Sequence, residues 1–147
     1  MARQLFEDGE GVSEALHGLI VRQPWADMIA EGKKTWEIRG RSTRVRGWIA
    51  IIAAGTGQIV GGGMLAGVIG PLSLDRYQTA ADLHCTPPER LDHLPYERTF
   101  AWCLSDGMAV APIRYEHPIG AVTWVRLMPG TREAFVARAR AKMASSE

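Results

Sequence analysis

The segment Gly47–Ala54, GWIAIIAA, runs for eight residues without a charged side chain. A short, continuous apolar run rich in isoleucine is typical of a strand that is buried on both faces. Such a strand lies inside a sheet, so the rest of the chain must supply neighbouring strands and covering helices. The length of 147 residues suits one domain with a real hydrophobic core.

Other short segments carry the β-branched and alternating patterns of strands. They are His17–Arg22, Lys34–Arg39, Met64–Pro71, Thr99–Leu104, Val110–Tyr115 and Ile119–Leu127. Gly55–Gly63, GTGQIVGGG, is expected to be a flexible loop. Few long crossovers separate the strands. This favours the α+β class, with a small, mostly antiparallel β-barrel of about six strands, over a doubly wound fold.

Two helices are predicted beside this sheet. A short helix follows the first strand, because Pro24 suits an opening turn and Gly32 suits a helix end. A terminal helix begins at Pro129. The apolar residues with which it covers one face of the sheet are Phe135, Val136 and Met143.

The chain is predicted to have one main domain with an appendage at each end. Residues 1–16 form an N-terminal extension, residues 17–128 form the domain, and residues 129–147 form a helix that packs on the domain or projects from it. Residues 72–98 read as a short helix followed by a proline-broken excursion.

Several classes of function are not expected. Gly55–Gly63 lacks the Lys-Ser/Thr ending of a phosphate-binding loop. His84, Cys85 and His93 are too few and too widely spaced for a metal site, and no cofactor is expected. Cys85 and Cys103 do not make a disulfide framework, which favours a reduced, cytoplasmic protein. No apolar run approaches the roughly 20 residues of a membrane span, and the first residues do not resemble a secretory signal.

The charge is concentrated in one segment, although the whole chain carries a formal charge of only +1. Residues 33–46 contain six basic residues and a single acid, Glu37. A local basic patch on a nearly neutral protein favours an anionic partner bound at one place. The alternative is a solvated loop whose arginines only keep the protein soluble.

The stretch Gln23–Arg39, QPWADMIAEGKKTWEIR, is predicted to bring polar side chains together. Strand alternation places Glu37 and Arg39 on one side of the second strand. The first strand, the short helix and the second strand bring Gln23, Lys34, Glu37 and Arg39 close together. We therefore expect this stretch to form a site.

The pattern L-I-V-R-Q-P-W-A-x-x-I-x-x-G-x-K-T-x-E-x-R, which begins at Leu19, is followed by R-G-x-I-A-I-x-A-A up to Ala54. Together these motifs resemble the ASCH domain of the PUA-like superfamily. Pro112 and the segments Ala101–Leu104 and Gly120–Trp124 resemble its closing strands. The resemblance implies a β-barrel with a cleft beside the first helix and binding of RNA or another nucleic acid.

The resemblance also implies a hydrolase as an alternative. One bacterial branch of the family hydrolyses the amide of N4-acetylcytidine, and another is reported as a ribonuclease. In the first branch the lysine matched by Lys34 activates a threonine three residues later, and here that position is Glu37. The expected acid on the later strand Met64–Pro71 is absent as well. If this chain is an enzyme, Lys34 and Glu37 are the catalytic candidates, with Glu37 as a base for water.

The favoured interpretation is a binding site for single-stranded RNA, a nucleotide or a nucleoside. Arginine and lysine suit phosphate, a carboxylate suits the amine of a base, and tryptophan suits stacking. The predicted ligand-binding residues are Gln23, Trp25, Lys34, Glu37, Arg39, Arg41, Arg44 and Arg46. Two alternatives remain: Trp25 packs only in the core, or the domain is a protein-interaction module with no nucleic-acid role.

Overall fold

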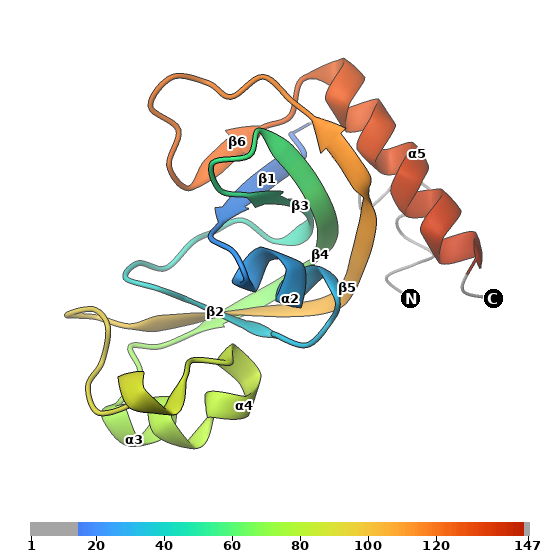
Figure 1. The fold of residues 1–147 in the computed structure, drawn as a ribbon. Coiled ribbons are helices and arrows are strands. Elements are labelled where there is room, and N and C mark those ends of the chain that lie inside the picture. The colour runs from blue at the N-terminus through green and yellow to red at the C-terminus, as the bar shows by residue number, and fades with distance from the viewer. Residues whose placement is uncertain (1–14, 146–147) are drawn as a thin grey trace.

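The computed structural model describes residues 15–145, which form one six-stranded sheet in the order β2-β5-β4-β3-β1-β6 (Figure 1). The strands are β1 His17–Val21, β2 Trp36–Arg39, β3 Gly47–Ala53, β4 Gln58–Ile69, β5 Phe100–Arg114 and β6 Trp124–Arg126. Strands β1 and β3 are parallel, and every other neighbouring pair is antiparallel. The sheet curls into a half-barrel, so the predicted α+β, mostly antiparallel fold of six strands is confirmed.

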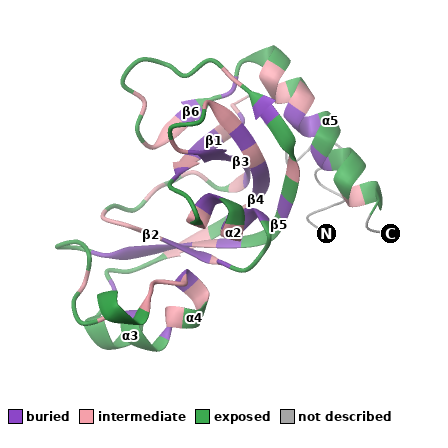
Figure 2. Ribbon diagram, viewed as in Figure 1, coloured by how far each residue is buried: buried purple, intermediate pink, exposed green. Residues whose placement is uncertain are grey.

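Strand β3 is buried on both faces, as its apolar run predicts. Ile49 and Ile51 belong to the cluster that includes α2 (Trp25–Ala30). Ala50 and Ile52 face the opposite way, into the cluster under α5 (Pro129–Ser145). The two helices therefore cover opposite faces of the same sheet, and burial is concentrated on the strands between them (Figure 2).

The expected loop Gly55–Gly63 is only partly a loop, and this prediction is wrong from residue 58 onward. Strand β4 already begins at Gln58 and includes three consecutive glycines. A Cβ atom on Gly61 would lie 2.6 Å from the Cβ of Ala30 in α2, and one on Gly62 would lie 2.5 Å from the Phe135 ring in α5. These glycines therefore allow a helix to approach each face closely.

Two predicted strands, Thr99–Leu104 and Val110–Tyr115, are one continuous strand, β5. The register between β4 and β5 shifts near Ser105, and Asp106 adopts a φ of +54°. The Asp-Gly step thus forms a bulge inside the strand instead of ending it. The edge strand β6 is much shorter than the predicted segment Ile119–Leu127.

The segment between β4 and β5 contains three short helical elements, where the sequence predicted one short helix followed by a proline-broken excursion. They are α3 Leu74–Thr79, α4 Ala81–His84 and the 3-10 turn Pro88–Arg90. Figure 1 shows α3 and α4 beside the end of the sheet that carries β2. The N–H group of Thr35, just before β2, donates to the carbonyl of Leu83 at 2.9 Å, which fixes this segment to the sheet.

The C-terminal helix packs on the sheet. Phe135 and Ala139 are fully buried, Val136 is nearly so, and Met143 contacts the same cluster. Most of the predicted N-terminal extension, residues 1–16, lies outside the described residues, as do residues 146–147. In the described part of the chain, no helix is long and apolar enough to cross a membrane.

Candidate functional site

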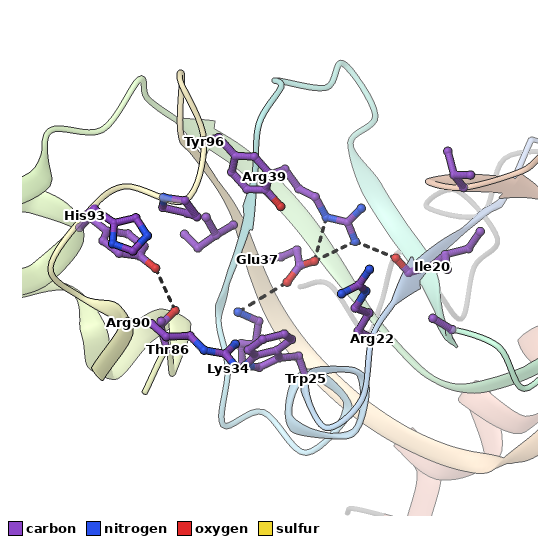
Figure 3. Close-up of a pocket in the computed structure, with 15 residues that line it drawn as sticks. Ile20, Arg22, Trp25, Lys34, Glu37, Arg39, Thr86, Arg90, His93 and Tyr96 are labelled. Atoms are coloured by element: carbon purple, nitrogen blue, oxygen red, sulfur yellow. Dashed lines mark hydrogen bonds and ion pairs between the residues drawn. The ribbon is translucent and has the colours of Figure 1, made fainter. Parts of the chain in front are cut away.

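A cavity of about 500 Å³ opens between α2, β2 and the segment that follows α4 (Figure 3). Lys34, Glu37 and Arg39 form its polar floor. Two walls face each other across this floor. The first carries Arg22 and Trp25, whereas the second carries Tyr77 of α3 and side chains from the segment after α4.

The C-terminus of α2 directs the chain into this floor. The N–H group of Gly32 donates to the carbonyl of Ile29 at 3.0 Å, and that of Lys33 donates to Met28 at 2.9 Å. With Gly32 at a φ of +79°, these bonds make a Schellman motif. The N–H group of Lys34 also donates to the carbonyl of Met28. The chain turns at this point, so that the side chain of Lys34 points into the protein.

The ammonium group of Lys34 is buried and fully engaged. Its Nζ atom donates to the carbonyl oxygens of Trp36 and His84, both at 2.7 Å, and lies 3.5 Å from Oε1 of Glu37. These three acceptors match its three N–H bonds. Burial lowers the pKa of Lys34, and the carboxylate of Glu37 opposes that shift. The Trp25 ring lies 5.8 Å from the same Nζ atom.

Glu37 connects Lys34 to Arg39. Its Oε2 atom accepts from Nε of Arg39 at 2.8 Å, and the Nη2 atom of Arg39 lies at the same distance. Nη2 also donates to the carbonyl of Ile20 in β1, at 2.7 Å. The network therefore spans from the end of α4 across β2 to β1, and it holds the polar floor in one geometry.

Trp25 is in contact with both the hydrophobic core and the cavity. It packs against the apolar cluster under α2, and its half-buried side chain also lines the cavity. Gln23 does not line the cavity: its Oε1 atom accepts from the N–H of Asp27, at 3.1 Å, in the first turn of α2. The prediction that Gln23 joins the other polar side chains of this site is therefore wrong.

The predicted arginines of the loop after β2 do not all reach the cavity. Arg41 lines a neighbouring cavity, described below. Arg44 and Arg46 are exposed and line neither cavity. The Nη1 atom of Arg46 donates to the carbonyls of Thr43 and Val45 in its own loop.

Sequence reasoning missed the second wall of the cavity. Its polar and aromatic members are Tyr77, Thr86, Arg90, His93 and Tyr96. No periodic pattern marks them, because they come from short helical turns and loops. The only signal is the basic and aromatic content of a proline-broken segment. From the sequence alone, that content is the same as in an ordinary exposed segment.

A buried histidine supports this second wall. His84 is fully buried and stacks on Tyr77, with ring centroids 4.4 Å apart. Its Nε2 atom lies 2.7 Å from the carbonyl oxygen of Tyr77, so this nitrogen carries the proton. Nδ1 then accepts from the hydroxyl of Thr86 at 2.8 Å. Burial lowers the pKa of His84, and the nearby Lys34 charge adds to that effect.

We expect the free energy of unfolding to fall as the pH drops below about 6.5, the ordinary pKa of histidine. The unfolded chain then binds a proton that folded His84 resists, and the loss levels off below the lowered folded pKa. Urea unfolding between pH 8 and pH 5 measures this dependence. His84→Gln should flatten this pH dependence, except for the contribution of His17, whose pKa is also lowered. Parallel profiles for wild type and His84→Gln would contradict the assignment.

The curled sheet, with α2 packed against it and a cavity beside that helix, is a PUA-like α+β fold. Residues 19–118 match the family model of the ASCH domain. The chain therefore belongs to the ASCH domain family.

Solved ASCH structures share this fold. The ASCH protein of Zymomonas mobilis superposes with a TM-score of 0.65 at 16% identity, covering 85% of this chain and 96% of that one. A mutant of the same protein gives the same TM-score and identity, with 84% and 97% covered. At this identity the likeness shows the fold alone. No curated protein is detectably similar to this chain in sequence.

Proposed function

We propose that the cavity beside α2 binds one nucleotide unit of a single-stranded nucleic acid, with RNA as the favoured partner. The observation that carries the proposal is a pair of guanidinium groups that have no partner within residues 15–145. Arg22 and Arg90 line the cavity on opposite walls, and neither side chain has a hydrogen bond or ion pair among the described residues.

The side chains that line the cavity carry more positive than negative charge. In the floor, Glu37 is shared between Lys34 and Arg39, which leaves one positive charge in excess. Arg22 and Arg90 add two more at the walls. Glu37 is the only acid among the lining residues. An excess of fixed positive charge around a partly enclosed space attracts an anion such as a phosphate group.

The cavity also offers apolar surface for a base. Trp25 and Tyr96 are aromatic, and Ile20, Ile38 and Pro95 add aliphatic surface. A volume of about 500 Å³ lies within the range of small-molecule sites. An aromatic face gives a base a stacking surface that tolerates any sequence. The combination fits a nucleotide better than it fits a purely apolar or purely anionic ligand.

The geometry favours binding over hydrolysis. A lysine that moves protons needs a free lone pair at some stage, but each N–H of Lys34 already has an acceptor. Glu37 likewise is held by Lys34 on one oxygen and Arg39 on the other. These contacts suit two fixed charges that shape the floor. Release of product from N4-acetylcytidine or from RNA, abolished by Glu37→Gln, would instead support the hydrolase alternative.

Replacing Arg22 and Arg90 together by alanine should weaken the binding of a short single-stranded RNA. Each lost phosphate contact should reduce the slope of log K against log salt by about 0.7. Fluorescence anisotropy of a labelled oligonucleotide at several salt concentrations gives both the affinity and the slope.

The matched control is the double substitution Arg44→Ala and Arg46→Ala, which removes the same charge away from the cavity. We expect it to change the slope less than the cavity pair does. Equal effects would show that binding depends on general surface charge and would reject the cavity as the site. Failure of the wild-type protein to bind RNA would leave a protein-interaction module as the better interpretation.

A further inference from the structure

A second cavity, of about 710 Å³, adjoins the first. Arg39 and Tyr96 line both cavities, so these two side chains form the boundary between them. Figure 3 shows Tyr96 beside Arg39 at the edge of the first cavity. The Tyr96 ring lies against Gly40, where a Cβ atom would come within 3.0 Å of it, and the residue is 46% exposed.

The second cavity has an aromatic base. The rings of Trp102 and Trp124 stack with centroids 5.7 Å apart and an interplanar angle of 8°. Trp102 is buried, and its Nε1 atom donates to the carbonyl of Arg41 at 2.8 Å, which fixes its orientation. Trp124 is only half-buried, and it lines the cavity. The stacked pair therefore presents a rigid aromatic surface rather than a mobile side chain.

The second cavity is also positively charged. Besides Arg39, it is lined by Arg41 and Arg98, against the single acid Glu97. Arg41 and Arg98 are exposed, and among the described residues neither guanidinium has a hydrogen bond or an ion pair. The guanidinium carbon of Arg98 lies 5.5 Å from the Phe100 ring. The aromatic surface and the excess of positive charge repeat the chemistry of the first cavity.

Arg39 lies at the boundary between the two cavities and has N–H donors there that no described residue uses. Its Nε and Nη2 atoms bind Glu37, and Nη2 also binds the carbonyl of Ile20. The two N–H bonds of Nη1 have no acceptor among the described residues. The Arg39 side chain is only 19% exposed, and its guanidinium carbon lies 5.5 Å from the Trp102 ring, so the group is fixed in place. A fixed guanidinium edge with two free N–H bonds suits a phosphate oxygen.

We propose that the two cavities form one groove whose ligand is at least a dinucleotide. One nucleotide unit occupies each cavity, and the phosphodiester between them lies against Nη1 of Arg39. The base in the second cavity rests on the Trp124 surface, and Arg41 and Arg98 attract the next phosphate. This inference rests on the proposed function, and it specifies the class of ligand. The ligand is a segment of a nucleic-acid strand, not a free nucleoside or mononucleotide.

The test compares a 5′-phosphorylated mononucleotide with the 5′-phosphorylated dinucleotide by calorimetric titration of the full chain. We expect the dinucleotide to bind about tenfold more tightly or better, the scale of one stacking contact. Equal affinities would overturn the inference and leave the proposed function in place. Absence of binding by both ligands would overturn the two together.

A pair of charge reversals locates the second unit. Arg98→Glu puts a negative charge on the wall of the second cavity, and Arg114→Glu makes the same change at the opposite end of β5. Both positions are exposed, so neither change should prevent folding. Arg98→Glu should remove the dinucleotide advantage, while its mononucleotide affinity should match that of Arg114→Glu. An advantage that survives in Arg98→Glu would reject the second cavity as the place of the second nucleotide.

Discussion

Lys34→Met should lower the free energy of unfolding by about 3–5 kcal/mol, because it removes two hydrogen bonds from a charged donor, each of which contributes about 1.5–3 kcal/mol. The Lys34 side chain is 3% exposed, and its loss leaves the carbonyls of Trp36 and His84 without their donor. Methionine has a similar length, so the result reports the missing ammonium more than a missing volume. Urea unfolding at pH 7 measures the change.

Lys33→Met is the matched control. Lys33 carries the same charge one residue earlier, but its side chain is 68% exposed and pairs with Glu31, at 3.3 Å. Its replacement should change the free energy of unfolding by less than about 0.5 kcal/mol. If the two variants unfold at the same urea concentration, Lys34 does not hold α4 against β2. The floor of the cavity would then lack the fixed geometry on which the proposed function depends.

Gly61→Ala should destabilise the protein by about 3 kcal/mol, at the upper end of the range for overpacking. The new Cβ atom would lie 2.4 Å from the carbonyl oxygen of Met108 in β5 and 2.6 Å from the Cβ of Ala30 in α2. The oxygen belongs to the backbone, so relief requires a shift of β4, β5 or α2. Thermal or urea unfolding would show the loss.

Gly67→Ala tests whether this loss comes from the close approach of α2 or from replacing any glycine in β4. Gly67 lies in the same strand as Gly61. Apart from its chain neighbours, no atom of the described residues lies within 4 Å of a Cβ atom built on Gly67. The change should therefore stay within about 1 kcal/mol and can be stabilising, because alanine restricts the unfolded chain. A Gly67→Ala loss as large as that of Gly61→Ala would contradict the packing explanation.

Local patterns in the sequence predicted the elements whose cause is local. The apolar run of β3 requires burial on both faces, and the structure supplies α2 and α5 for those faces. Gly32 ends α2 because its φ of +79° is costly for other residues. The early motifs also carried the resemblance that the ASCH family match of residues 19–118 confirms.

Local patterns failed where a distant segment changed the meaning of a residue. Glycines in β4 resemble a loop in isolation, but α2 and α5 need their missing side chains in order to pack. The Asp-Gly step of β5 resembles an interruption, but pairing with β4 absorbs it as a bulge. Strand pairing and helix packing decide such cases, because they contribute more free energy than the local conformational preference of one residue.

The sequence by itself determined half of the candidate site: it placed Lys34, Glu37 and Arg39 within one short stretch whose turn and strand bring them together. Only the tertiary structure decided what faces them. Arg90 and Tyr96 lie more than fifty residues further along the chain. Arg22 directly follows β1, and nothing in the sequence distinguishes it from the ordinary end of a strand. Contacts between segments so far apart leave no periodic trace in a single sequence. They arise when α4 docks on β2, where the carbonyl of His84 accepts from the ammonium group of Lys34.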